Sequence, residues 1–380
     1  MKIGFLITYF YPHTGGAENN CYFLAKELAK KHEVHVFCSG SEKKEETIEE
    51  IKVHRSKEVF RIKYYLAYYP DIVKSVLAHK LDVLHVHGFG FLQHDKVIRI
   101  LKEKSPETKI ICTPHGPFMA LKKYNFFARQ FKNFYMPRLK KSLELYDKII
   151  EVNPSQHEWM SNDYGIPKEK IEFVPNGISK SVFDENNSND IKILRKKYSI
   201  NGKKIISYLG RVQKYKGIDQ VIKVLPEIKK NHPNVIFVIA GKDFGDKKRL
   251  EDLASSLNVK ENVRFTGEVS EKEKLAILDI SEIFVFPSEW EAFGIVVLEA
   301  MARGNAIIST STEGGKYLIK ENENGYLFNL GDIKKLREEL EVLLKNDKLR
   351  KRMMKVNKDK AKKYQWVKIV KILEKVYSES

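Results

Sequence analysis

The sequence predicts an α/β protein with two doubly wound parallel sheets, and three features lead to this prediction. Short apolar runs rich in Val and Ile alternate with helix-length amphipathic segments along the first part of the chain. The same alternation starts again near residue 204. Between the two series lies FDENNSNDIKI, residues 183–193, which is predicted to be a linker or surface loop. Because strands that alternate with helices form parallel sheets covered on both faces, we expect two such domains joined near residue 180.

The predicted elements follow in chain order. In the first series, the β-rich runs predict strands at Lys2–Thr8, Glu33–Cys38, Asp82–His87, Lys109–Thr113, Asp147–Val152 and Ile171–Val174. Between them, helical periodicity predicts helices that include Ala17–Lys31 and Leu139–Leu145. In the second series, strands are predicted at Lys204–Tyr208, Val235–Ala240, Val263–Phe265, Ile283–Pro287 and Ala306–Ser309. The predicted helices of this part are Ile218–Lys230, Asp332–Lys345, a basic helix over 347–363 and a last helix near Trp366–Val376.

Composition excludes several classes of protein. Hydrophobic residues make up 42% of the 380 residues, which is too much for a disordered chain. Three cysteines far apart in the sequence exclude a disulfide scaffold and indicate a reducing compartment, so we expect a cytoplasmic protein. The longest apolar runs, such as VIFVIA at 235–240, are too short to span a membrane. The apolar N-terminus lacks a small-residue cleavage site and is predicted to be a buried strand rather than a signal peptide.

The chain is strongly basic, with a formal net charge of +18. Such a charge favours anionic partners, which include nucleic acids, anionic membranes and phosphorylated small molecules. The basic residues are spread along the chain, and no helix-turn-helix, zinc finger or aromatic RNA-binding motif is present in the sequence. We therefore expect no nucleic-acid partner, although a basic nucleic-acid-binding protein stays an alternative.

Two strand-to-helix loops carry residues suited to phosphate. Gly15 and Gly16 follow the first strand, and their backbone N–H groups can approach a phosphate at a helix N-terminus. Arg211 and Lys216, in LGRVQKYKG, lie five residues apart across a later turn and are able to converge on a diphosphate. The alternatives are an ordinary turn for the glycines and solvated surface cations for Arg211 and Lys216.

The segment FPSEWEAFGIVVLEAMARG, residues 286–304, is the most informative. Glu291 is expected in the turn before an apolar helix and Glu299 two turns inside it. Burying two carboxylates on such a stretch is costly unless they bind something, and sugar hydroxyls are suitable partners. The backbone N–H groups of Ala292, Phe293 and Gly294 would face the same place. The alternative is a helix with one capping acid and one exposed acid.

Histidines follow two predicted strands of the first domain. His115 stands at the carboxyl end of a strand, in CTPHGPF, and is a candidate site residue. His85 and His87 lie on the same face of another strand, but the sequence offers no third metal ligand next to them. The chain also lacks an Asp-x-Asp motif, so we expect no metal site.

Taken together, these motifs resemble those of the retaining glycosyltransferases of family 4. The E-x7-E element in EAFGIVVLE, with GRVQKYKG, VPNGI at 174–178, TPHG, the GGAE loop and STEGGKYLIKENENGYLF at 311–328, follows the order of that family. The resemblance covers nearly the whole chain. It implies the GT-B fold, in which two Rossmann-like domains face each other across a deep cleft and the C-terminal helix returns to the N-terminal domain. The implied domains are 1–178 for the acceptor, 179–363 for the nucleotide-sugar, and 364–380 as the returning helix.

The resemblance also implies roles for single residues. Glu299 would bind the ribose hydroxyls, and Glu291, with the backbone of Ala292, Phe293 and Gly294, would hold the donor sugar. Arg211 and Lys216 would neutralise the diphosphate, with help from Gly15 and Gly16, and His115 would lie next to the reacting face of the sugar. The backbone near Gly267–Val269 would frame the base. The implied activity is the retaining transfer of a hexose-type sugar from a nucleotide-diphosphate sugar, such as a UDP or GDP sugar, to a saccharide or lipid-linked acceptor, with no tightly bound cofactor. Cell-surface polysaccharide or glycolipid synthesis is the expected setting.

The segment ALKKYNFFARQFKNFYMPRLKK, residues 120–141, suggests a membrane partner. It is rich in Lys and Arg without an acid, and Tyr124, Phe127, Phe131 and Phe134 follow helical spacing. A basic amphipathic helix of this kind can lie on an anionic membrane surface, which would place the protein at the inner face of the cell membrane. The alternative is an ordinary helix whose aromatic stripe packs on the core.

A nucleotide-sugar epimerase of the same fold is the alternative enzyme for the whole chain.

Overall fold

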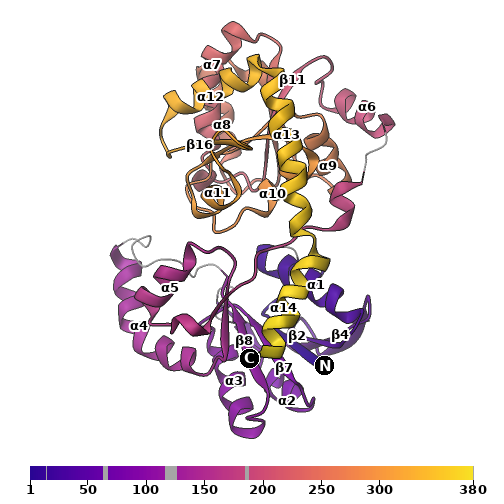
Figure 1. Cartoon of the computed structure of the whole chain (residues 1–380), viewed down its shortest axis with the longest axis vertical. Coiled ribbons are helices and arrows are strands. Elements are labelled where there is room, and N and C mark those ends of the chain that lie inside the picture. Colours follow the sequence, from indigo (N-terminus) through magenta and orange to yellow (C-terminus); the bar gives the residue numbers. More distant parts are fainter. Residues whose placement is uncertain (14, 63–66, 116–125, 185–187, 380) are drawn as a thin grey trace. The chain divides into compact units, whose positions relative to one another are not determined.

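The computed structural model describes residues 1–13, 15–62, 67–115, 126–184 and 188–379. The chain forms two compact units (Figure 1). Unit 1 consists of Met1–Gly177 and Trp366–Ser380, and unit 2 of Ile178–Gln365. The boundaries expected at residues 178 and 363 lie close to these, and the binding role expected for each domain stays a prediction.

Unit 1 contains an eight-stranded sheet in the order β10-β9-β8-β7-β1-β2-β4-β3. Neighbouring strands are parallel except β3, which is antiparallel to β4. The strands are β1 Lys2–Leu6, β2 Glu33–Gly40, β3 Lys44–Ile48, β4 Ile51–Lys57, β7 Val83–His87, β8 Lys109–Thr113, β9 Lys148–Glu151 and β10 Ile171–Phe173, with a separate pair, β5 Phe60–Arg61 and β6 Ala67–Tyr68. The helices are α1 Gly16–Ala29, α2 Asp71–Leu77, α3 Leu92–Lys104, α4 Phe126–Glu144, α5 Gln156–Tyr164 and α14 Trp366–Glu379.

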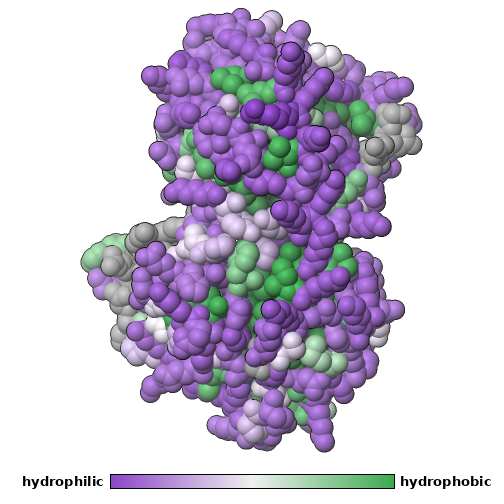
Figure 2. Space-filling view, in the orientation of Figure 1, coloured by the Kyte–Doolittle hydropathy of each residue, from purple (hydrophilic) through white to green (hydrophobic). Residues whose placement is uncertain are grey.

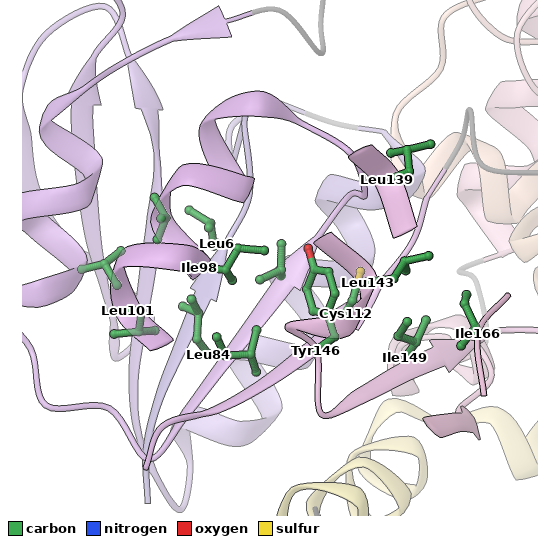
Figure 3. Packing of buried hydrophobic residues seen from close by; sticks show 14 of the residues in the cluster. Leu6, Leu84, Ile98, Leu101, Cys112, Leu139, Leu143, Tyr146, Ile149 and Ile166 are labelled. Atoms are coloured by element: carbon green, nitrogen blue, oxygen red, sulfur yellow. The ribbon is translucent and has the colours of Figure 1, made fainter. Parts of the chain in front are cut away.

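The two faces of this sheet are covered by different helices. Successive side chains of a strand point to opposite faces. On β7, Leu84 lies in an apolar cluster with side chains of α3 and α4, among them Leu101 and Leu143 (Figure 3). The next residue, His85, lies on the opposite face, where its Nδ1 is 2.6 Å from the hydroxyl of Tyr377 in α14. The last helix of the chain therefore covers the face that α3 and α4 leave open.

The C-terminal helix returns to unit 1, as predicted. Figure 1 shows the yellow α14 beside the indigo α1, and the two helices are in contact. The rings of Phe23 in α1 and Trp366 in α14 stack with centroids 5.8 Å apart. Leu373 and Tyr377 are buried on the same side of α14. Their burial joins the two ends of the chain in one core.

Unit 2 contains a six-stranded parallel sheet in the order β13-β12-β11-β14-β15-β16. Its strands are β11 Lys204–Leu209, β12 Val235–Ala240, β13 Val263–Gly267, β14 Ile283–Phe286, β15 Ala306–Thr310 and β16 Gly325–Phe328. Its helices are α6 Ser188–Lys197, α7 Ile218–Asn231, α8 Lys247–Ser256, α9 Glu271–Asp279, α10 Ile295–Arg303, α11 Glu313–Leu318, α12 Ile333–Lys345 and α13 Asp347–Ala361. The strand order reverses between β11 and β14, which is where doubly wound sheets bind ligands.

Some sequence predictions are wrong or incomplete. The linker predicted at 183–193 is wrong for its second half, because α6 begins at Ser188 and buries Leu194. Asn, Asp and Ser favour helix starts as well as turns, so the composition alone was ambiguous. The strands β3 and β4 were not predicted, because Lys44–Ile48 is a largely polar segment at the edge of the sheet and Ile51–Lys57 is interrupted by charged residues.

Figure 2 shows hydrophilic side chains over most of the visible face of each unit, with apolar residues in limited patches. Within the described residues, no helix combines the length and the apolar character needed to cross a bilayer.

The packing of α14 can be tested with two neighbouring residues of the same helix. Leu373 is fully buried, whereas 41% of Ile372 is exposed. Leu373→Ala should lower the free energy of unfolding of unit 1 by about 2–5 kcal/mol, because it leaves a cavity in the core. Ile372→Ala should cost less than about 1 kcal/mol. Urea unfolding followed by fluorescence measures both, and equal effects would contradict the packing of α14 on unit 1.

Candidate functional site

Two neighbouring strand ends of unit 2 bring three predicted residues together. The parallel strands β11 and β14 pair with each other, so their carboxyl ends lie at the same edge. The loop after β11 carries Arg211 and Lys216, and the loop after β14 carries Glu291. Ligands of doubly wound sheets bind outside strand ends at such a reversal point. The fold therefore places these three residues where a ligand is expected.

The loops approach each other closely because glycine stands at the points of contact. Gly217 has a φ of 64°, and a Cβ there would overlap the carbonyl oxygen of Pro287. The backbone N–H of Glu289 donates to the carbonyl oxygen of Tyr215 at 2.8 Å. A Cβ at Gly314 would in turn overlap the backbone of Phe293. Larger residues at these glycines would push the three loops apart.

Lys216 and Glu291 form an ion pair between the first two loops. The Nζ of Lys216 lies 3.0 Å from Oε2 of Glu291. Only 9% of the lysine side chain is exposed, and its ammonium group lies over the rings of Tyr215 and Phe286, at 4.8 and 5.2 Å from their centroids. Removing an ammonium ion from water is costly, and the carboxylate and the two rings offset that cost. An ammonium group has three donors, so Lys216 can bind an anion in addition to Glu291.

Arg211 lies at the more exposed side of the same loop. Its Nη2 donates to the hydroxyl of Tyr215 at 2.9 Å, and its Cζ lies 5.6 Å from the centroid of the Phe244 ring. Both of these partners are uncharged. The charge of the guanidinium is therefore available to an anionic ligand. Tyr215 and Phe244 hold the guanidinium in place, and neither of them was predicted from the sequence.

Glu299 lies in α10 and is paired with Lys274 of α9. The Nζ of Lys274 is 2.8 Å from Oε1 of Glu299 and 2.6 Å from a carboxylate oxygen of Glu271. Only 13% of the Glu299 side chain is exposed, so the alternative of an exposed surface acid is wrong. Burial raises the pKa of Glu299, and the charge of Lys274 opposes that shift. Lys274 was missed because it is distant from Glu299 in the sequence and nothing in its motif marks it.

At the start of α10, the side chain and the backbone of Phe293 face different surroundings. Gly294 is the N-cap residue, with a φ of 89°. The Phe293 side chain is buried against Tyr317 and Tyr364, with ring centroids 5.8 and 6.1 Å away. Phe293 therefore serves the core through its ring, and only its backbone is available to a ligand. Ala292 is partly exposed next to it.

The segment Gly267–Val269, which is expected to frame the base, begins at the end of β13. Gly267 is exposed there, and its carbonyl oxygen accepts from Gly241 N–H at 2.8 Å. Gly241 directly follows β12, so this contact joins two strand ends at the edge where doubly wound sheets are expected to bind ligands. A role of this segment in binding a base stays a prediction.

In unit 1, the predicted glycines and His115 also follow strand ends. Gly15 is the N-cap residue of α1, and a Cβ at Gly16 would meet no atom within 4 Å. Glu18 stands in the first turn of α1, close to Gly15, and adds a negative charge there. His115 Nε2 lies 3.0 Å from Nδ1 of His87, and burial lowers the pKa of His115 to about 4. This histidine is therefore neutral at pH 7.

A cavity of about 500 Å³ opens at the carboxyl ends of β1 and β2, and the sequence analysis did not predict it. Its lining is largely polar and charged, with both signs present: Tyr9, Pro12, His13, Ser39, Gly40, Ser41, Glu42, Lys44, Glu46, Arg55, Glu58 and Arg61. The hydroxyl of Tyr9 accepts from Arg61 at 2.7 Å and donates to Glu58 at 3.1 Å. Hydroxyl-rich molecules suit such a lining, because it offers donors and acceptors side by side.

The membrane prediction for residues 120–141 stays a prediction. Tyr124 lies outside the described residues, as do the side chains of Phe127, Phe131 and Phe134. The described part of α4 includes Leu139 and Leu143, which are buried in the core of unit 1 (Figure 3), and Phe126, which is exposed.

Two parallel sheets with these loops at the strand ends define a GT-B architecture. The family model described as "Glycosyltransferase Family 4" matches residues 14–182, and the one described as "Glycosyl transferases group 1" matches residues 190–360. An uncharacterized glycosyltransferase of Methanocaldococcus jannaschii is 30% identical over 344 residues, which are 86% of this chain and 84% of that protein. The chain therefore belongs to the family 4 glycosyltransferases.

Other similar proteins agree with this assignment. The phosphatidyl-myo-inositol mannosyltransferase of Mycobacterium leprae is 24% identical and covers 99% of this chain and 96% of its own length. Among solved structures, Anabaena HepE in complex with UDP has a TM-score of 0.79 at 19% identity and covers 100% of both chains. At this identity the structural likeness shows the fold, and it confirms the predicted GT-B class.

The pairing of Glu299 can be tested through Lys274. Lys274→Met leaves a buried carboxylate without its counterion and should destabilise unit 2 by about 3–5 kcal/mol at pH 8. The native pKa of Glu299 already lies above its unfolded value, and this variant raises it further. Proton uptake at lower pH therefore favours the native state, and the loss should shrink towards pH 5.

Lys248→Met is the matched control for this experiment. It breaks a pair of similar length, 2.7 Å to Asp252, whose two side chains are largely exposed to water. The control should change stability little at either pH. Chemical denaturation at pH 5 and pH 8 measures both variants, and a loss for Lys274→Met that does not depend on pH would contradict the pairing.

Proposed function

We propose that this protein is a retaining glycosyltransferase that moves a hexose-type sugar from a nucleotide-diphosphate sugar to a saccharide or lipid-linked acceptor. The observation that carries the proposal is the ion pair of Lys216 and Glu291 at the reversal point of the unit 2 sheet. In this pair, the ammonium group of Lys216, which can bind a phosphate, lies next to the carboxylate of Glu291, which can accept hydrogen bonds from hydroxyl groups. A nucleotide-sugar offers both of these groups next to each other.

Lys216 and Arg211 bind the diphosphate in this proposal. When the bond between the sugar and the β-phosphate breaks, negative charge grows on the phosphate oxygens. Cations that are already in place stabilise that charge without reorganising, which is how preorganised sites lower a barrier. Lys216 is held by Glu291 and two rings, and Arg211 by Tyr215 and Phe244. Both charges are therefore fixed before the donor binds.

The carboxylates of unit 2 bind hydroxyl groups. Glu291, with the backbone of Ala292, Phe293 and Gly294, holds the donor sugar, and Glu299 accepts the ribose hydroxyls. Lys274 contacts Oε1 of Glu299, which keeps the carboxylate oriented and favours its ionised form. The backbone of Gly267–Val269 borders the base. HepE was solved with UDP, so UDP-sugars are the first donors to try, followed by GDP-sugars.

Unit 1 binds the acceptor in this proposal. The polar cavity at the ends of β1 and β2 has the lining that a hydroxyl-bearing acceptor needs. The neutral imidazole of His115 can hydrogen-bond to a sugar hydroxyl without adding charge. The open Gly16, with Gly15, borders a phosphate, which requires the Glu18 carboxylate beside Gly15 to turn away or to be neutralised. The mycobacterial relative is named a phosphatidyl-myo-inositol mannosyltransferase, which supports a lipid-linked acceptor in this proposal. The proposed setting is glycolipid or cell-surface polysaccharide synthesis at the inner face of the membrane.

The proposed step uses the donor, the acceptor hydroxyl and groups of this chain. In front-face attack, the acceptor hydroxyl approaches the side of the sugar from which the diphosphate leaves. The departing phosphate oxygen takes the hydroxyl proton as the new bond forms, so the configuration of the sugar is retained. The residues proposed here bind, orient and stabilise charge, and no protein nucleophile takes part.

Nucleotide binding to unit 2 is the test of the donor site. At about 100 times its dissociation constant, a nucleotide should stabilise the native state by about 2.7 kcal/mol, which raises the melting temperature by roughly 5–10 °C. UDP, GDP and ADP are compared by calorimetry. One of them should produce the rise, and Glu299→Ala should abolish it.

Glu338→Ala is the control for this titration. Glu338 lies on α12 in the same unit, and about half of its side chain is exposed. The control variant should keep the whole nucleotide effect. The proposal fails if none of the three nucleotides shifts the wild-type protein, or if both variants respond as the wild type does.

A further inference from the structure

Three histidines of unit 1 meet at one place outside the sites described above. They are His35 on β2, His54 on β4 and His79, which follows α2. One ring nitrogen of each lies within 4.8 Å of the corresponding nitrogens of the other two. The ring centroids are 4.5–5.1 Å apart. His35 and His54 are buried and His79 is partly exposed, so the cluster lies just beneath the surface.

The outer nitrogen of each ring contacts a group that only accepts hydrogen bonds. His35 Nε2 lies 3.1 Å from Oε1 of Glu33, and His54 Nδ1 contacts the carboxylate of Glu45. His79 Nδ1 lies 2.9 Å from the carbonyl oxygen of Ser75. Carboxylate and carbonyl oxygens require an N–H opposite them, so the proton of each neutral ring belongs on its outer nitrogen.

This arrangement leaves lone pairs on the inner nitrogens. His35 Nδ1 and His54 Nε2 are only 2.8 Å apart, and with both outer nitrogens protonated neither has a hydrogen to share. Two lone pairs at that distance repel each other unless a cation lies between them. A proton could join these two rings, but it would leave the unprotonated nitrogen of His79 unused. A metal ion can bind all three nitrogens at once.

We propose that His35, His54 and His79 bind a divalent transition-metal ion. Neutral imidazole is a preferred ligand of Zn²⁺, Ni²⁺ and Cu²⁺, and metal-binding histidines usually donate their other N–H to a carboxylate or carbonyl, as all three rings here can do. Zn–N bonds of about 2.0–2.1 Å place the nitrogens of a tetrahedral site roughly 3.3 Å apart. This value is larger than the 2.8 Å between His35 Nδ1 and His54 Nε2, and it is smaller than the 4.8 Å within which one nitrogen of each ring lies. Small ring movements are therefore enough to form the site.

Such an ion would connect three elements of unit 1. It would link the end of α2 to β2 and β4, close to the edge of the sheet. Glu45, which holds the outer nitrogen of His54, stands between Lys44 and Glu46, and both of these line the unit 1 cavity. The ion would thus stiffen one wall of that cavity. The metal site itself does not depend on the function proposed for the cavity.

The test is a metal titration of the full-length protein after treatment with EDTA. Zn²⁺ should bind with one high-affinity equivalent. At about 100 times the dissociation constant it should raise the melting temperature of unit 1 by roughly 5–10 °C. His79→Gln should weaken this binding at least about tenfold. His157→Gln, a control in the same unit whose histidine lies near Glu151 outside the cluster, should bind Zn²⁺ as the wild type does.

A second measurement needs no variant. Co²⁺ added to the wild-type protein should produce visible absorption bands of a nitrogen-coordinated ion that saturate at one equivalent. Absence of these bands together with absence of a Zn²⁺ effect would overturn the proposal and leave a proton shared by His35 and His54. Equal Zn²⁺ affinity of His79→Gln and the wild type would overturn it as well, because the ion would then be bound elsewhere.

Discussion

The ion pair between Lys216 and Glu291 is the interaction on which the proposed chemistry depends. It exists because β11 and β14 are parallel neighbours whose following loops leave the sheet at the same edge. Glycine at position 217 lets the two loops approach, and the rings of Tyr215 and Phe286 surround the ammonium group. Contacts with Glu291 and the two rings offset the free energy of desolvating the lysine when the chain folds. The charge is therefore in position before any ligand arrives, which is the condition for electrostatic catalysis.

Both units bring candidate site residues together in the same way. The loops that follow parallel strands all begin at the same edge of the sheet. Residues far apart in the sequence therefore come close together there without long loops. In unit 2 that edge gathers the cations and carboxylates of the candidate donor site. In unit 1 it gathers the polar cavity and His115. Hydrophobic cores lie beneath these edges, and α14 completes the core of unit 1. This packing fixes the positions of the strand ends and of the loops that follow them.

The sequence was sufficient for the fold class, the returning C-terminal helix and the family, because these follow from periodicity and from motifs in order. It also indicated Arg211, Lys216 and Glu291, since each follows a predictable buried strand. It did not indicate Lys274 or the three histidines near β2, because their partners are set by tertiary packing rather than by spacing. The edge strand β3 was missed because an exposed polar strand lacks the apolar alternation that marks a half-buried one. Its neighbour β4 is mostly buried, but charged residues interrupt its apolar pattern. The start of α6 was mistaken for a linker because its first turn is polar.

The most direct measurement is the rate of sugar transfer from a nucleotide-sugar, followed by NMR, in wild type, Lys216→Met and Lys214→Met. Lys214 lies two residues from Lys216 in the same loop but is exposed. We expect Lys216→Met to lower kcat by about 10²–10³ with a smaller change in KM, because the lost interaction strengthens as the bond breaks. Lys214→Met should stay within about twofold of wild type, and the product should keep the anomeric configuration of the donor. An unchanged rate in Lys216→Met, or a product of inverted configuration, would contradict the role given to this lysine or the retaining mechanism.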